Sequence, residues 1–360
     1  MNSLPPKNEI WYTTSDGCIV TPYENAKFGA NIISNTYENG KGVITFDAPI
    51  VFMRSLTFRK CLNLVNITLP NSLTEIGCGA FIGCKSLTSI TIPDSVTIIY
   101  TGAFLSCSSL VDITIPDGVT EIQWLAFCGC TSLENITLPN SIKSIDSALF
   151  KKCSSLKEIT IPDSVEIIMG EAFEGCTGLA NVTLGKGVKD IWHNAFKGCT
   201  SLTSIIIPDS VYGIREETFA DCVNLTSIVI PDSVDSIMDE AFANCVRLGD
   251  VSLGRGVTYL GDGAFKGCTS LTKIFIPKSV RYIHEDVFAK CTSLKEVYLE
   301  ERQFLPKNSG AFVDNAPEFK IYAPKGSVDG CSFVWPDQVC WRNYRDKGII
   351  IEYEPENKEQ

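Results

Sequence analysis

Apolar and polar positions recur in the same order every 23 residues along most of this chain. Each copy contains a phenylalanine, a cysteine three residues later and a leucine three residues after that. The phenylalanines are Phe58, Phe81, Phe104, Phe127, Phe150, Phe173, Phe196, Phe219, Phe242, Phe265 and Phe288. A unit of this length cannot bury its apolar face alone, so successive copies must stack against each other. The pattern therefore predicts a solenoid.

One copy of the repeat shows which elements it contains. Ile90 and Ile92 alternate with polar residues, which predicts a β-strand with one buried face. Pro93 ends that strand because it has no amide hydrogen to donate to a sheet. Phe104 and Cys107 are three residues apart, a spacing that places both side chains on one face of a short helical turn. We expect an α/β solenoid with a parallel sheet on one face, short strands and helical turns on the opposite face, and a cap at each end.

The residue types that recur in each copy follow the pattern of a known repeat family. The pattern C-x-x-L-x-x-I-x-I-P-x-S-V-x-x-I-x-x-x-A-F, over roughly residues 58–300, is similar to the BspA-like leucine-rich repeat. The resemblance implies a curved, right-handed solenoid with its parallel sheet on the concave face. It also implies a bacterial or protist surface protein that binds other proteins. Ser95 and Gly118 stand where the commoner leucine-rich repeat has asparagine or cysteine, so the asparagine ladder of receptor-type repeats is absent.

The two ends of the chain depart from the repeat, as the capping ends of a solenoid must. Residues 1–42 are predicted to form an N-terminal cap, and the first strand is expected near residues 43–46. The solenoid is assigned to residues 43–303. Residues 304–360 are assigned to a last, degenerate repeat and a C-terminal cap, with the last strand at residues 319–324.

Composition excludes some partners. The net charge of -11 and the pI near 4.8 argue against nucleic acid, because phosphate binding needs clustered lysine and arginine. No apolar run reaches the length of about 18 residues that suggests a membrane span. The start of the chain lacks the basic and apolar segments of a signal peptide. An extracellular or cell-surface location is therefore expected from the family resemblance alone.

Eleven of the 16 cysteines fall in one column of the repeat, from Cys61 to Cys291. Stacked strands lie about 4.7–4.9 Å apart, which is inside the Cα–Cα range of about 4.4–6.8 Å for a disulfide. Free cysteine also packs well as a small buried apolar residue. We favour a ladder of buried thiols because a continuous column offers no rule for pairing, with disulfides as the alternative.

A column of outward-facing strand residues is the candidate binding site. It reads Thr68, Thr91, Thr114, Thr137, Thr160, Thr183, Ile206, Val229, Ser252, Phe275, Tyr298 and Tyr322. The threonines are interpreted as structural, because threonine favours strands and pairs with itself across them. Exposed aromatic residues are typical of interfaces. The predicted contact residues are Phe275, Tyr298, Tyr322, Ile206, Val229, Lys273 and Glu296, and the alternative is that the C-terminal cap covers these rings.

Other chemistry is sparse in this sequence. The aspartates that follow the strands, such as Asp94, are interpreted as turn residues, because a calcium ion needs about six to eight oxygens around one point. His193 and His284 lie four repeats apart in different columns, so no metal site, cofactor or catalytic cluster is expected. We predict a non-enzymatic, adhesin-like module that binds host or neighbouring-cell proteins. The alternative is a structural spacer or self-associating rod, and the oligomeric state is left open.

Overall fold

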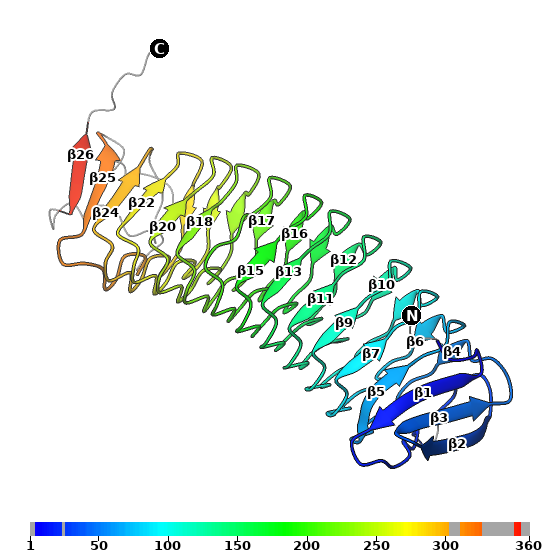
Figure 1. Cartoon of the computed structure of the whole chain (residues 1–360). Helices are drawn as coiled ribbons and strands as arrows, with labels where there is room; N and C mark the ends of the chain where they lie inside the picture. The colour runs from blue at the N-terminus through cyan, green and yellow to red at the C-terminus, as the bar shows by residue number, and fades with distance from the viewer. Residues whose placement is uncertain (1–3, 24–25, 302–309, 326–348, 354–360) are drawn as a thin grey trace. The chain divides into compact units, whose positions relative to one another are not determined.

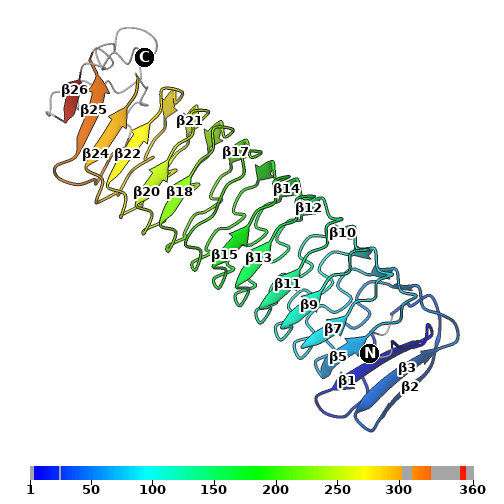
Figure 2. The same cartoon turned by 45° about the horizontal axis from the view of Figure 1, so that its top comes forward.

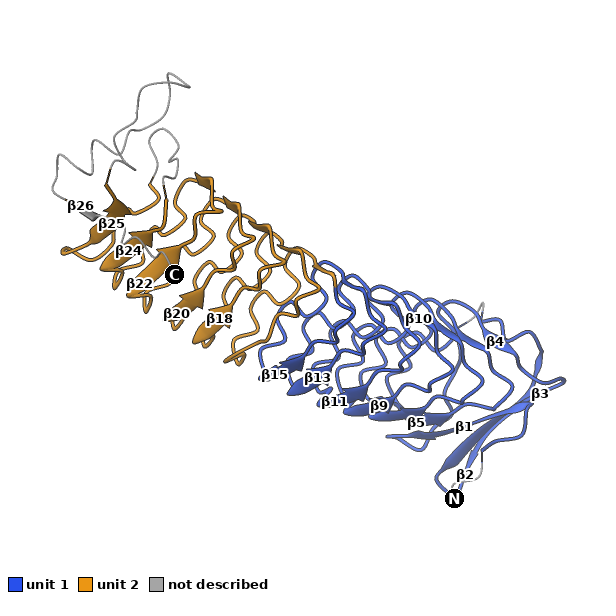
Figure 3. Ribbon diagram, turned by 90° about the horizontal axis from the view of Figure 1, so that it is seen from above, with its two compact units in different colours: residues 1–188 blue, residues 189–360 orange. Residues whose placement is uncertain are grey.

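The computed structural model describes residues 4–23, 26–301, 310–325 and 349–353 (Figures 1 and 2). These residues form β-strands joined by turns, without a helix among them. They fall into two compact units, residues 1–188 (unit 1) and residues 189–360 (unit 2), which are coloured separately in Figure 3. In each unit the 23-residue repeats form stacked coils with parallel strands, so the predicted solenoid is confirmed.

Three antiparallel strands begin unit 1, namely β1 (Glu9–Thr14), β2 (Ile32–Glu38) and β3 (Lys41–Phe46). Asn39 and Gly40 connect β2 to β3 with φ angles of 52° and 78°, the left-handed pair that a tight hairpin requires. β1 lies between β3 and β5 (Leu64–Thr68) and is antiparallel to both. The strand expected at residues 43–46 therefore belongs to an antiparallel sheet, and the predicted boundary after residue 42 falls inside β3.

The parallel strands of unit 1 form two separate sets. The longer ones are β5, β7 (Ser89–Thr91), β9 (Asp112–Thr114), β11 (Asn135–Thr137), β13 (Glu158–Thr160) and β15 (Asn181–Thr183). The shorter ones are β4 (Phe52–Met53), β6 (Glu75–Ile76), β8 (Ile98–Ile99), β10 (Glu121–Ile122), β12 (Ser144–Ile145) and β14 (Ile167–Ile168). Strand partners are one repeat apart, as in the pairing of Ile67 with Ile90. Short strands outside the main sheet were expected from the sequence, and the shorter set provides them.

Unit 2 repeats this arrangement. Its longer strands are β18 (Ser227–Val229), β20 (Asp250–Ser252), β22 (Lys273–Ile276), β24 (Glu296–Leu299), β25 (Lys320–Pro324) and β26 (Ile350–Tyr353). Its shorter strands are β16 (Asp190–Ile191), β17 (Gly213–Ile214), β19 (Ser236–Ile237), β21 (Tyr259–Leu260) and β23 (Tyr282–Ile283). The strand predicted at residues 319–324 corresponds to β25, but it is not the last, because β26 pairs with it in parallel.

The core of each unit is built from identical side chains that stack on their own copies. Phe81 and Phe104 in unit 1 have ring centroids 5.3 Å apart with planes 3° apart, and Phe242 and Phe265 in unit 2 are 5.2 Å and 2° apart. All four rings are fully buried. The central prediction from the sequence, that equivalent apolar residues of neighbouring coils meet inside the solenoid, is confirmed.

The cysteine column follows the phenylalanine stack and hydrogen-bonds to it. Cys107 Sγ donates to the carbonyl of Phe81 at 3.1 Å, and Cys245 Sγ donates to the carbonyl of Phe219 at 3.2 Å. Buried carbonyls need partners, and the thiol of the next coil supplies one. The cysteines that the structure describes are all free, which confirms the thiol ladder and excludes disulfides within this column.

The predicted helical turns are wrong, and the backbone angles give the reason. Gly102 and Ser106 both have a φ of 60°, in the left-handed region. A left-handed residue every fourth position ends any right-handed helix before it completes a turn. The same two positions are left-handed in the other coils of unit 1, at Leu56, Lys60, Gly79, Gly83, Leu125, Gly129, Ala148, Lys152, Glu171 and Gly175.

The amides of these turns also lack the bonding pattern of a helix. The amide of Cys107 donates to the carbonyl of Phe104 at 3.0 Å, which closes a turn within the coil. The amide of Phe104 instead donates to Ala126 of the next coil at 2.8 Å. Helical bonds run four residues back along the same segment, whereas these alternate between a short turn and the neighbouring coil.

Candidate binding surface on the strand face of unit 2

The outward side chains of the longer strands form two columns on what we call the strand face. The face column is the candidate column of the sequence, with Thr137 and Phe275 as members. The rim column lies two residues earlier on each strand, at Asn135 and Lys273 for the same coils. Alternate residues of a strand point to the same side, so both columns face outward. The residue between them, such as Ile274, is buried.

The strand face of unit 1 is polar, and its side chains bond to one another. The face column is threonine in every coil from Thr68 to Thr183. In the rim column, Ser89 Oγ donates to Asn66 Oδ1 at 2.5 Å, and Asn135 Nδ2 donates to Asp112 Oδ1 at 3.0 Å. These bonds join rim residues, and the structural interpretation of the threonine column stays a prediction.

The face column of unit 2 is exposed and mostly apolar. Ile206 is 85% exposed, Val229 is 66% exposed and Phe275 is 54% exposed. Ile351 of β26 extends the column, since it pairs with Tyr322 and is itself exposed. A contiguous row of exposed apolar side chains often marks an interaction surface, whereas single, scattered ones need no explanation.

Three aromatic rings of this column form a continuous stack. Phe275, Tyr298 and Tyr322 are paired by the register of β22, β24 and β25. The centroids of Phe275 and Tyr298 are 4.7 Å apart with planes 11° apart, and Tyr298 and Tyr322 have the same spacing and angle. Each inner ring face is therefore covered by the next ring, and the ring edges point outward. A partner meets a ridge of edges, not an open ring face.

The rim residues beside these rings carry charge. Lys273 Nζ lies 6.0 Å from the centroid of the Phe275 ring, and the hydroxyl of Tyr298 donates to Glu296 Oε2 at 3.1 Å. Burial, followed by this bond to a carboxylate, raises the pKa of Tyr298 above its ordinary value. Lys273, Glu296 and Lys320 are neighbours in register.

The seven predicted contact residues thus share one surface in unit 2, although only some of them touch. Phe275, Tyr298, Lys273 and Glu296 form one cluster with Tyr322, while Ile206 and Val229 continue the same column toward lower residue numbers. The alternative prediction, that the C-terminal cap covers the rings, concerns residues 326–348, which lie outside the described residues. Ile206 itself lies in a segment without an assigned strand.

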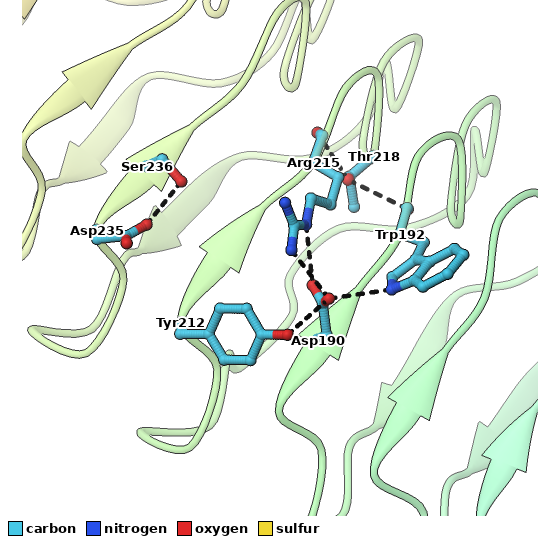
Figure 4. Close-up of polar contacts among 7 residues, drawn as sticks. All are labelled: Asp190, Trp192, Tyr212, Arg215, Thr218, Asp235 and Ser236. Carbon is cyan, nitrogen blue, oxygen red and sulfur yellow. Dashed lines mark hydrogen bonds and ion pairs between the residues drawn. The ribbon is translucent and has the colours of Figure 1, made fainter.

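A second cluster in unit 2 was missed by sequence reasoning (Figure 4). Asp190 of β16 is 4% exposed and accepts hydrogen bonds from three side chains. Arg215 donates from Nε at 3.1 Å to Oδ1 and from Nη2 at 3.0 Å to Oδ2. The hydroxyl of Tyr212 donates to Oδ2 at 2.8 Å, and Trp192 Nε1 donates to the same oxygen at 3.0 Å.

This cluster has a structural explanation. Both oxygens of Asp190 are occupied, so the carboxylate is not placed to exchange a proton with a substrate. The bond to Asp190 raises the pKa of Tyr212 and the pKa of Arg215, which keeps both donors protonated. Gly213 is the register neighbour of Asp190, because Ile191 pairs with Ile214. The sequence offered no clear signal, because the column of Asp190 already holds charged and polar residues in unit 1, such as Glu75, Glu121 and Ser144.

Metal and acid–base chemistry find little support among the residues that the structure describes. No group of three or more histidine, cysteine, aspartate or glutamate residues is arranged there to hold a metal ion. His284 Nδ1 lies 3.7 Å from Asp262 Oδ1 and its ring packs on Tyr259, whereas His193 lies beside Trp192. The described part of the chain also contains no helix long and apolar enough to cross a membrane.

Two of the turn aspartates have a role that differs from the one expected. Asp163 Oδ1 accepts the amide of Lys186 at 2.8 Å, and Asp232 Oδ1 accepts the amide of Arg255 at 2.7 Å. Both bonds reach the next coil and do not close the aspartate's own turn. They occur where glycine replaces the strand-ending proline, and a Cβ on Gly185 would lie 2.4 Å from the carbonyl oxygen of Pro162.

Comparisons with known proteins agree with this geometry. Residues 32–157, 143–237 and 212–315 match the family described as "BspA type Leucine rich repeat region (6 copies)". No curated protein matches the chain.

Several solved structures are similar. A leucine-rich repeat protein from Bacteroides ovatus ATCC 8483 is 24% identical, with a TM-score of 0.60 over 98% of this chain and 100% of that one. The pneumococcal vaccine antigen PcpA is 18% identical, with a TM-score of 0.54 over 83% and 84%. A leucine rich cell surface protein from Faecalibacterium prausnitzii A2-165 is 28% identical, with a TM-score of 0.49 over 83% and 88%. The first two likenesses concern the fold. The three family matches together span residues 32–315, well over half of the sequence, and the chain belongs to the BspA-type leucine-rich repeat family.

Proposed function

We propose that this chain is a non-enzymatic protein-interaction module that binds its partner through the strand face of unit 2. The observation that carries the proposal is the exposed apolar face column, with Ile206, Val229 and Phe275 each more than half exposed. Threonine fills the same column in unit 1 without harm to the coils, so the fold does not require apolar residues there. Apolar exposure costs solubility, and a binding role explains why the cost is borne.

The finer proposal is that the partner is a protein of a host or of a neighbouring cell, which would make this an adhesin-like surface or secreted protein. The family resemblance supports that assignment. The stacked rings support a protein ligand over a carbohydrate, because sugars bind to open aromatic faces and the inner faces of this stack are covered.

A threonine variant of the face column tests the proposal. Ile206→Thr, Val229→Thr and Phe275→Thr together give unit 2 the column that unit 1 already has, and threonine is well suited to strands. The intact chain is immobilised and its capture of purified extracellular-matrix and cell-surface proteins is measured. We expect the variant to fold and to lose capture at least tenfold. A control with Thr114→Ser, Thr137→Ser and Thr160→Ser should bind as the wild type does. Equal capture by the threonine variant contradicts the proposal.

A spacer role is the second candidate, and the self-bonded polar face of unit 1 favours it for that unit. A surface of uniform threonine offers little for a partner to recognise. A chain that captures no protein and stays monomeric in a light-scattering concentration series would support the spacer role for the whole molecule.

A further inference from the structure

The charges of the rim column in unit 2 alternate in sign along four consecutive coils. They are Asp250, Lys273, Glu296 and Lys320, in that order. The last three are aligned by strand register, and Asp250 lies one 23-residue repeat before Lys273, in coils whose phenylalanines stack at 5.2 Å. Read in reverse, the order is plus, minus, plus, minus. The column is therefore complementary to a reversed copy of itself.

The face column beside it has the same property. Reversal about the midpoint between β22 and β24 places Phe275 opposite Tyr298, and Ser252 opposite Tyr322. One coil further out, Val229 comes opposite Ile351, because Ile351 is the register neighbour of Tyr322. Aromatic meets aromatic, the smallest residue meets a large one, and aliphatic meets aliphatic. The rim of unit 1, with residues such as Asn66, Asp112 and Glu158, contains no lysine or arginine and lacks this complementarity.

We propose that unit 2 binds a second copy of this chain, strand face against strand face, about a twofold axis that runs parallel to the strands between β22 and β24. The inference rests on the proposed function, since it names the partner of the same surface. Lys273 then faces Glu296 of the second copy, and Asp250 faces Lys320 of the second copy. A twofold axis makes each pair occur twice, which is the ordinary symmetry of a homodimer.

The contact is compatible with known sheet packing. Two sheets pack about 10 Å apart with their strands within about 30° of each other, which leaves room for one layer of interdigitating side chains. Six coils at about 4.8 Å each give a patch roughly 25 Å long, at the small end of specific interfaces. The dimer is therefore expected to be weak and to depend on concentration. The charge pairs fix the direction and register of the copies more than they add affinity.

Charge reversal tests this arrangement in the full-length chain. Sedimentation velocity over a concentration series should show a monomer–dimer equilibrium for the wild type. Lys273→Glu and Glu296→Lys should each weaken it at least tenfold, because each places two like-charged pairs across the twofold axis. A mixture of the two single variants should restore a heterodimer, since glutamates of one copy then face lysines of the other. Lys157→Glu, a surface charge reversal in unit 1, is the matched control and should leave the equilibrium unchanged.

Three outcomes overturn the homodimer. The first is a wild type that stays monomeric at the highest concentration reached. The second is a dimer that is insensitive to both reversals, and the third is a pair of single variants that fail to associate when mixed. The proposed function fails separately, when the threonine variant of the face column still captures other proteins as the wild type does. A monomeric chain whose capture depends on that column would refute the second copy as partner and leave the binding surface standing.

Discussion

Units 1 and 2 have the same interior and different strand faces. Phe104 and Cys107 of unit 1 are buried in the same way as Phe242 and Cys245 of unit 2. On the outside, Thr137 of unit 1 occupies the position that Phe275 occupies in unit 2. Because one backbone accommodates both residues, the outward column is free to change without cost to the coil. Residue changes at such an outward position can therefore serve binding without disturbing the fold.

The shorter strands offer a second contrast between the units. Ser144 and Met169 of unit 1, two coils earlier, fill the pair of positions that Asp190 and Arg215 take in unit 2. Unit 1 thus has an uncharged pair there, whereas unit 2 buries an ion pair. Apolar replacement of a buried ion pair is often neutral or stabilising, so the pair is not explained by stability alone. Trp192 and Tyr212 are held in place by the same carboxylate, which is a consequence that apolar packing lacks.

The largest predicted effect tests whether the two interiors are equivalent. Burial raises the pKa of Cys176 in unit 1 and of Cys222 in unit 2 to about 12. An unfolded thiol ionises near pH 8.5, so the free energy of unfolding is fully maintained below about pH 8.5 and falls as the pH rises toward 12. Each such thiol should cost about 2–3 kcal/mol between pH 8 and pH 10.5.

Urea unfolding at the two pH values, followed by the fluorescence of Trp124 in unit 1 and of Trp192 in unit 2, measures this effect. We expect both reporters to show a similar loss. A Cys222→Ala variant should lose less than the wild type on the same pH change. A loss confined to one unit would show that the thiol columns are not equivalent.

The next effect concerns the buried ion pair. Arg215→Met leaves the Asp190 carboxylate buried without its cation and should lower the free energy of unfolding by about 2–3 kcal/mol, less than for a fully buried pair because the guanidinium is partly exposed. The double variant Asp190→Ile with Arg215→Met replaces the ion pair with apolar residues and should come within about 1 kcal/mol of the wild type. Urea unfolding measures both. A double variant as unstable as the single one would contradict the comparison.

The smallest effect concerns the turns. Gly175→Ala places a side chain on a residue with a φ of 72° and should cost about 1 kcal/mol. Gly213→Ala is the control, since Gly213 has no positive φ and a Cβ there would meet only Ser236 Oγ, at 3.4 Å. It should shift the unfolding free energy by less than about 0.5 kcal/mol. Thermal melting of both variants measures the difference. Equal losses of stability would show that the left-handed φ of Gly175 is not the reason for its sensitivity.

The buried part of the fold could be predicted because it repeats. The residue types of Phe104, Cys107 and Ile90 recur at fixed intervals, and only stacking of the coils buries every copy of each one. The turns could not be predicted in the same way. Their left-handed positions hold Gly102 in one coil but Leu125 or Glu171 in others, so the column carries no consistent glycine signal.

The candidate surface was partly predictable for the same reason. Phe275 and Tyr298 stand out in the sequence because the same column holds threonine throughout unit 1, whereas their exposure and stacking could be seen only in the structure. The Asp190 cluster involves residues from two coils that depart from the repeat together. Single departures from a repeat have no period, so nothing in the spacing indicated that Asp190 and Arg215 would meet.

The most direct test of the account replaces the rings and measures stability and binding together. Phe275→Ala with Tyr298→Ala removes an exposed stack, so the free energy of unfolding should change by no more than about 1.5 kcal/mol, while association and capture are lost. Phe265→Ala, which empties a buried ring site, should cost about 3–5 kcal/mol. The account is contradicted if the double variant unfolds the end of unit 2 while binding survives, because the rings would then be packing contacts and not a binding surface.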